Sequence, residues 1–270
     1  MKRWIAWATG VALLVAPVAG AAPLAETVVD ATFASKYMTD GFKIGGDNPV
    51  WQLGVGLNAI AGTGASLLAW TSLQQDRLNR EYDEVDLIAR YGHEFFSGKP
   101  LALATRVYFD YWFYPNRTAT AGADGAPVEE PMKKGNKMGA GFSLPSLLPI
   151  AGSWLVPSYN LHYWTYWRRN QSDRYQGGAH HEFLMEYYHE LPKLIPGVVS
   201  HYVGLAGSLN YHDGAFGVTP GLSHTTARLS TAVYAMGIWL SASVNQQWSH
   251  QPTVDPTDEF WSTISLSKQF

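Results

Sequence analysis

Apolar and polar residues alternate along most of the chain with a period of two. In residues 82–96, for example, Val85 and Leu87 fall on one face while Glu84 and Asp86 fall on the other. This alternation is typical of strands whose two faces meet different surroundings. The pattern predicts twelve strands, at residues 28–38, 51–60, 65–73, 82–96, 101–114, 138–144, 157–167, 179–191, 198–210, 223–235, 238–248 and 258–270.

The connections between these segments are alternately short and long. The short ones cover residues 61–64, 96–100, 145–152, 192–197 and 236–237. Transmembrane barrels have short periplasmic turns and longer outer loops, and closing the sheet pairs every backbone group within the bilayer. The pattern therefore predicts an all-β fold, a transmembrane antiparallel up-and-down β-barrel of about twelve strands. Period alone does not say which face is inward, so a water-soluble barrel has to be weighed on other grounds.

The last predicted strand supplies one of those grounds. It places Ile264 and Leu266 on one face and ends the chain on the aromatic residue Phe270. A final strand with a terminal Phe resembles the assembly signal of bacterial outer-membrane barrels, although Lys268 departs from that pattern. The resemblance implies two partners, the barrel assembly machinery and outer-membrane lipid.

The N-terminus indicates export. Lys2 and Arg3 precede a mostly apolar run at residues 5–18, and Ala19-Gly20-Ala21 supplies small residues for cleavage. An uncleaved anchor is the alternative, but the run is short and contains Pro17. We expect a signal peptide at residues 1–21, a barrel at residues 22–270, and delivery to the bacterial outer membrane.

Composition agrees with a membrane barrel. Aromatic residues make up 14% of the chain and charged residues only 15%, whereas a soluble α/β enzyme would carry more charge. A mean hydropathy of -0.12 argues against a helical membrane protein, and a net charge of -3 gives no sign of nucleic-acid binding. The absence of cysteine excludes disulfides and thiolate chemistry. Aromatic residues near strand ends predict two girdles, formed by Trp51, Trp112, Trp154, Trp167, Tyr187, Trp239 and Trp248.

The same alternation predicts a charged lumen of both signs. The facing strands 82–96 and 101–114 carry charges that we expect to oppose one another. These charges could form a constriction that selects solutes, or a lattice of ion pairs that braces or plugs the barrel. The two interpretations are compatible, and the candidates are Asp30, Lys36, Glu84, Asp86, Arg90, Glu94, Arg106, Asp110, Glu182, Glu186, Glu190 and Arg228.

Metal and catalytic sites are the less favoured interpretations. His180 and Glu182 share a strand face and could hold a cation only with help from a neighbour such as His162, so we favour an ion-pair stripe and expect no metal or cofactor. Ser223 and His224 offer a nucleophile beside a base, but adjacent residues on a strand point to opposite faces. No Gly-x-Ser-x-Gly or His-Glu-x-x-His motif occurs, so we do not expect an enzyme.

Residues 35–115 resemble a family of uncharacterised, porin-like proteobacterial outer-membrane barrels. That family has a Tyr-x-x-Arg-Gly pattern at its first loop, and this chain has Tyr37-Met38-Thr39-Asp40-Gly41 without the Arg. The resemblance implies a fold and a location but no activity. Its motifs are Ser35-Lys36-Tyr37, Asp47-Asn48-Pro49-Val50, Trp70-Thr71-Ser72, Glu84-x-Asp86 and Tyr111-Trp112-Phe113-Tyr114-Pro115.

The leading functional hypothesis is a porin-like channel for passive passage of small polar solutes. The alternative is a structural or surface-interaction barrel whose long loop at residues 116–137 binds a partner. A lipid-modifying outer-membrane hydrolase is a third and weaker hypothesis.

Overall fold

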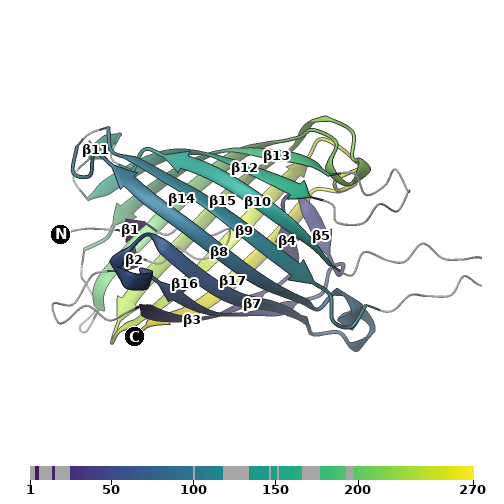
Figure 1. Ribbon diagram of the computed structural model, residues 1–270, viewed down its shortest axis with the longest axis horizontal. Coiled ribbons are helices and arrows are strands. Elements are labelled where there is room, and N and C mark those ends of the chain that lie inside the picture. Colours follow the sequence, from purple (N-terminus) through teal and green to yellow (C-terminus); the bar gives the residue numbers. More distant parts are fainter. Residues whose placement is uncertain are drawn as a thin grey trace, which may run out of the picture.

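The computed structural model describes residues 4–5, 14–15, 25–99, 101–117, 134–145, 147–150, 152–165, 177–192 and 198–270. Within these, twelve long strands form one closed antiparallel barrel, which confirms the predicted fold (Figure 1). The strands are β3 (Glu26–Ala34), β6 (Val50–Asn58), β7 (Ala65–Gln74), β8 (Glu84–Phe95), β9 (Leu103–Phe113), β10 (Lys134–Ser143), β12 (Ser153–Thr165), β13 (Gly178–Glu190), β14 (Val198–His212), β15 (Gly221–Ala235), β16 (Ile238–Ser249) and β17 (Glu259–Gln269).

Each barrel strand pairs with its neighbours in chain order, and two pairings close the cylinder. The last strand, β17, pairs with the first, β3, with Ile264 opposite Phe33. Beyond β17, the amide of Phe270 donates to the carbonyl of Thr27 over 2.9 Å, so the terminal residue extends this pairing. The pairing of β10 with β12 bypasses the short strand β11 (Leu148–Ile150), which forms a hairpin with the start of β12.

The remaining elements are short. Strands β4 (Tyr37–Thr39) and β5 (Phe42–Ile44) form a separate hairpin, and β1 (Trp4–Ile5) pairs with β2 (Leu14–Val15). In the connections that the structure describes, there are three short 3-10 helices, η1 (Ile60–Gly62), η2 (Arg77–Tyr82) and η4 (Ala215–Gly217). No helix among the described residues is long and apolar enough to cross a membrane. Apart from β1 and β2, the predicted signal peptide lies outside the described residues.

The two ends of the barrel differ. The C-terminus and β11 lie at one end, here called the terminal end (Figure 1). The opposite end, here called the loop end, carries the hairpin of β4 and β5, which projects inside the cylinder (Figure 1). The up-and-down order therefore places the link through η2 at the loop end and the link through η1 at the terminal end.

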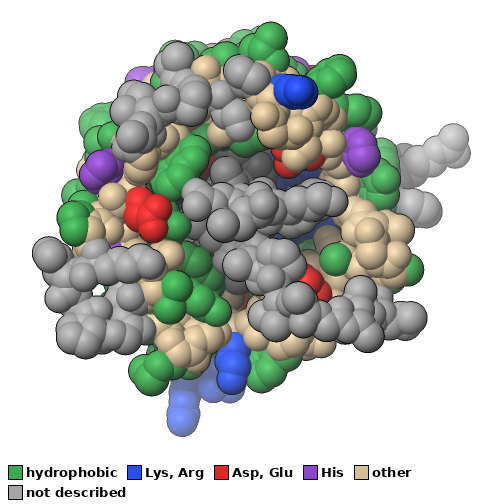
Figure 2. All heavy atoms as spheres, turned by 90° about the vertical axis from the view of Figure 1, so that its left-hand side faces the viewer, with side chains coloured by type: hydrophobic (Ala, Val, Ile, Leu, Met, Phe, Trp, Pro, Cys, Tyr) green, Lys and Arg blue, Asp and Glu red, His purple; other side chains and the backbone are tan. Residues whose placement is uncertain are grey.

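The outer wall is apolar and the inner wall polar. Along β6, Leu53, Val55 and Leu57 are exposed on the outside, while Gly54 and Gly56 alternate with them on the inside. Viewed from the terminal end, hydrophobic side chains surround the circumference (Figure 2). This is the distribution expected of a barrel whose outside meets hydrocarbon.

The predicted aromatic girdle is wrong in part. Trp51 and Trp248 are exposed on the outer wall. Three other members have the parity of the inner wall, since each is an even number of positions from a lumenal residue of its own strand: Trp112, Trp154 and Trp239. The rings of Trp154 and Trp239 both pack 6.0 Å from that of Tyr202. Trp167 lies outside the described residues.

The first predicted strand ends earlier than expected. Strand β3 stops at Ala34, and the chain then turns inward to form the hairpin. An unbroken alternation over the predicted strand 28–38 puts Tyr37 on the same outer face as Phe33, but Tyr37 is buried inside beside Ala34 and Val50. The bend at residues 35–36 breaks the period of two, which is why alternation misplaces Tyr37.

Candidate functional site

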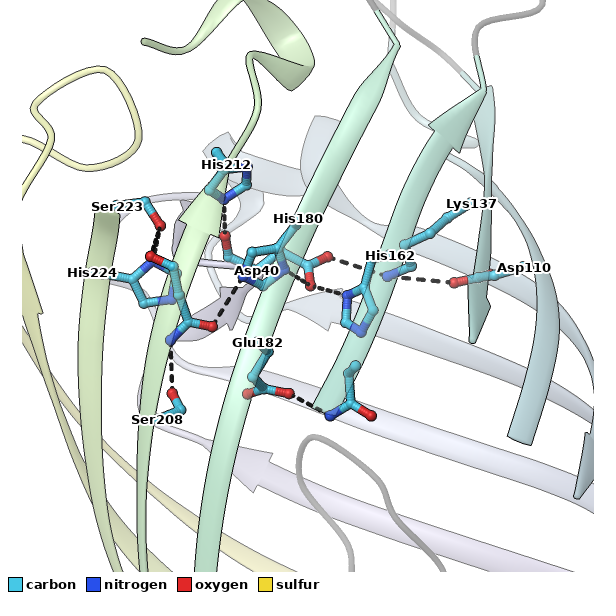
Figure 3. A network of polar contacts seen from close by, with 12 residues as sticks. Asp40, Asp110, Lys137, His162, His180, Glu182, Ser208, His212, Ser223 and His224 are labelled. Atoms are coloured by element: carbon cyan, nitrogen blue, oxygen red, sulfur yellow. Dashed lines mark hydrogen bonds and ion pairs between the residues drawn. The ribbon is translucent and has the colours of Figure 1, made fainter. Parts of the chain in front are cut away.

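Four histidines form a row across the inner wall near the loop end. They lie on four adjacent strands, with His162 on β12, His180 on β13, His212 on β14 and His224 on β15. The register places His180 directly opposite both His162 and His212, and it places His224 opposite Asn210. All four side chains are buried. We call this group the histidine row (Figure 3).

The tip of the β4–β5 hairpin meets the histidine row. Asp40 and Gly41 have positive φ angles of 49° and 91°, which is the geometry of the two-residue turn that Asp-Gly favours. This turn directs the Asp40 side chain toward the histidines. Its Oδ1 lies 2.7 Å from Nδ1 of His162 and 3.2 Å from Nδ1 of His180.

A lysine and a third histidine also hold Asp40. Lys137 of β10 donates from Nζ to Oδ2 over 3.2 Å, and His212 donates from Nε2 to the Asp40 carbonyl over 3.0 Å. Burial opposes ionisation of Asp40, but Lys137, His162 and His180 outweigh burial and hold the pKa of this carboxyl well below its usual range. The hairpin tip is thus a carboxylate enclosed by cationic and imidazole groups.

Further contacts hold the hairpin along its length. At the tip, Gln247 donates to the Gly41 carbonyl over 2.9 Å. At the base, Lys36 and Lys43 reach the two carboxylate oxygens of Glu259, at 2.5 and 2.6 Å. The Glu259 side chain is only 3% exposed, so this ion pair is far better shielded than a surface pair. The hairpin is therefore fixed to the wall at both ends.

A β-bulge corrects the expectation for Ser223 and His224. The register of β14 and β15 shifts at this point, so Ser223 is an extra residue and both side chains are buried. Ser223 Oγ lies 2.9 Å from Nδ1 of His224 and donates to the Asn210 carbonyl over 3.0 Å. Adjacent residues do meet here, yet Ser223 is 0% exposed, and this arrangement gives a substrate no access to its hydroxyl.

A chain of polar groups crosses the inner wall next to the histidine row. Arg106 donates to Asn160 over 2.9 Å, and Asn160 donates to Glu182 over 2.8 Å. On the same strand as Glu182, Glu186 accepts from Arg228 over 2.6 Å. The structure thus brings together four of the predicted lumenal residues, Arg106, Glu182, Glu186 and Arg228, through two short links.

The predicted opposition between β8 and β9 is shifted in register. Arg106 lies opposite Gly92, Asp110 opposite Ile88 and Asp86 opposite Trp112. Asp110 instead lies 3.8 Å from Lys137, which the sequence pattern left in a loop. Glu84, Asp86 and Asp110 are buried. Four further inward candidates, on β3, β8 and β13, are half-buried: Asp30, Arg90, Glu94 and Glu190.

The alternation of apolar and polar residues does not assign three residues of this site to the inner wall. Asp40 falls in the connection between the predicted strands 28–38 and 51–60. Asp-Gly between short apolar segments is nevertheless a recognised hairpin signal. Lys137 was placed before its strand because β10 begins at Lys134 rather than Met138. His212 falls two residues beyond the predicted end of its strand, and extending the alternation from Asn210 places it inside.

No protein-family model and no curated protein matches this sequence. Solved structures match its fold. LpxR from Salmonella typhimurium superposes with a TM-score of 0.54 at 11% identity, over 90% of this chain and 100% of that one. The NanC porin gives 0.53 at 8% identity over 90% and 100% of the two chains. The β domain of the Bordetella autotransporter BrkA gives 0.52 at 13% identity over 92% and 100%. At such identities the likeness shows the fold alone, that of outer-membrane β-barrels.

Proposed function

We propose that this protein is an outer-membrane channel for passive passage of small polar solutes. The fold alone does not select this function, because it is shared with a porin and with an autotransporter domain. The observation that carries the proposal is the contrast between the two walls. The outer wall is mainly apolar, while charged side chains of both signs occur on the inner wall from Glu259 near the loop end to Glu94 near the terminal end.

The hairpin and the polar chain beside it give such a channel a narrow region. The hairpin occupies part of the lumen at the loop end (Figure 1). The polar chain that runs from Arg106 through Asn160 to Glu182 borders this region. Fixed charges of both signs in a narrow passage select solutes by charge and order the water there. We infer that Arg106 contributes to the selectivity of the channel.

The other hypotheses have less support. A surface-interaction barrel depends on the loop at residues 116–137, most of which lies outside the described residues. A hydrolase built on Ser223 and His224 lacks an accessible hydroxyl, because Ser223 is fully buried. Membership of the uncharacterised porin-like family remains a proposal based on the motifs between residues 35 and 115. Within them, Tyr37 to Gly41 forms the first strand and turn of the inserted hairpin.

Single-channel conductance tests the proposal. The mature barrel, reconstituted into planar bilayers, should produce discrete conductance steps, and liposomes that contain it should swell in solutions of small polar solutes. Replacing Arg106 by Met removes a positive charge from the narrow region. The permeability of cations relative to anions should therefore rise.

The control is the neighbouring substitution Val107→Met. Val107 is 54% exposed on the outer wall, so this variant should conduct as the wild type does. A properly assembled barrel that neither conducts nor swells liposomes would contradict the proposed function. An equal change of selectivity in both variants would contradict the role of Arg106.

A further inference from the structure

The hairpin tip and the barrel wall bring three metal-ligand atoms together. These atoms are Oδ1 of Asp40, Nδ1 of His162 and Nδ1 of His180, and all lie within 4.8 Å of one another. A tetrahedral zinc ion with ordinary bond lengths places its ligand atoms about 3.4 Å apart. The oxygen already lies 2.7 Å and 3.2 Å from the two nitrogens. We propose that Asp40, His162 and His180 bind a divalent transition-metal ion, with Zn²⁺ the best match.

The surroundings of His180 favour a metal on its Nδ1. Asn210 donates its amide to Ser208 over 2.7 Å, which directs the amide oxygen toward the ring, 3.0 Å from Nε2 of His180. In a neutral ring, that oxygen accepts the proton on Nε2 and the lone pair lies on Nδ1. A metal ion that takes the place of the proton between Nδ1 and Asp40 Oδ1 would bind both atoms. A carbonyl on the far nitrogen is the usual way to orient a ligating imidazole.

Lys137 leaves the ligand oxygen free. It donates to Oδ2 of Asp40, so the carboxylate can use Oδ1 for a single metal bond. His212 donates to the Asp40 main chain and positions it without becoming a ligand. The carboxylate is therefore oriented by two contacts that do not compete for the metal (Figure 3).

The donor set selects the class of metal. Two imidazole nitrogens and one carboxylate oxygen suit zinc and its neighbours in the first transition row, whereas Ca²⁺ and Mg²⁺ take oxygen ligands. Three protein ligands also leave a fourth position for water or another small ligand.

The ligands come from two separate parts of the fold. Asp40 belongs to the hairpin, and His162 and His180 belong to the wall. A bound ion would thus join the hairpin to β12 and β13. This inference does not rest on the proposed channel, because metal binding can be measured whether or not the barrel conducts.

Isothermal titration of the EDTA-treated barrel with ZnCl₂ tests the site. We expect one ion bound per wild-type chain, and visible absorption bands of tetrahedral Co²⁺ when cobalt replaces zinc. Asp40→Ala and His180→Ala should abolish both signals. Asn210→Ala should weaken binding by roughly 10- to 100-fold, because it removes only the group that orients His180.

Two further variants distinguish loss of metal binding from loss of the folded hairpin or barrel. His162→Gln keeps an amide donor toward Asp40 but removes the imidazole, so it should abolish binding while assembly, read from heat-modifiable migration on a gel, is unchanged. His181→Ala removes the neighbouring histidine, which faces outward and contacts Tyr159, and it should bind zinc as the wild type does. Absence of stoichiometric zinc in the wild type would overturn the proposal, since protons alone would then bridge these groups. Retention of binding in the Asp40, His162 and His180 variants would overturn it as well.

Discussion

Two lysines, Lys36 and Lys43, share the carboxylates of Asp47 and Glu259 at the base of the hairpin. Glu259 is buried, whereas the Asp47 side chain is 68% exposed, so the same two cations serve an inner and an outer partner. Exposed pairs contribute little to stability because water and salt screen them. The ion pairs of Asp47 should therefore change the pKa of its carboxyl group more clearly than they change the free energy of unfolding.

We expect the carboxyl of Asp47 to titrate below its usual range. Hydrogen bonds from Lys36 and then Lys43 stabilise the charged form and lower the pKa of Asp47. Because the folded pKa is depressed, this contact is fully present above the ordinary pKa and is lost as the pH falls through the lowered value. NMR titration of the side-chain carboxyl in micelles measures it. Lys43→Met should raise the pKa, and Lys99→Met, at the terminal end, should leave it unchanged.

At the scale of elements, the hairpin is the part that alternation could not predict. A period of two identifies β6, β8 and β9 because each keeps one face outside for its whole length. The inserted hairpin has no lipid-facing side, so its pattern carries no such contrast. The bulge at Ser223 adds one residue to the strand and so reverses which residues face inward beyond it. The alternation does not predict this extra residue. The inward charges were predictable, but their partners depended on register, which the alternation does not contain.

A substitution in the turn of the hairpin tests whether the tip packs against the barrel wall at His224. Gly41 has φ +91°, and a Cβ there would lie 2.4 Å from the His224 ring. Gly237 also has a positive φ, +76°, but has nothing within 4 Å of that position. Both substitutions to Ala carry a backbone cost of about 1–2 kcal/mol. Gly41→Ala should lose about 1–3 kcal/mol more in urea unfolding, because only that side chain collides with a packed neighbour. Equal losses would mean that the turn does not sit against His224.

At the scale of the whole molecule, an apolar outer wall and a polar inner wall predict that neighbouring positions tolerate opposite substitutions. An outward position should not accept a charge, whereas an inward position should accept the loss of one. Val107 faces outward near the middle of β9, and Arg106 faces inward toward Asn160. Val107→Arg should lower folding stability by about 2–4 kcal/mol, since a cation within the hydrocarbon loses its hydration. Arg106→Val should cost less, because lumenal water can solvate the partners it leaves. Reversible unfolding in lipid vesicles compares them, and a harmless Val107→Arg beside a non-folding Arg106→Val would reverse the assignment of the two walls.

The seating of the hairpin also sets an order of events during assembly. Asp40 is separated from Lys137, His162 and His180 by 97, 122 and 140 positions, and Gly41 from Gln247 by 206. Contacts so distant in sequence form late, because the intervening chain must be arranged first. The hairpin emerges early in synthesis, and Tyr37 and Ile44 can pack at once against Val50 and Trp70. The tip, by contrast, has no docking partners until β10 to β16 are in place. The tip is consequently seated across the lumen only in the last stage of assembly, when the strands that hold it have joined the wall.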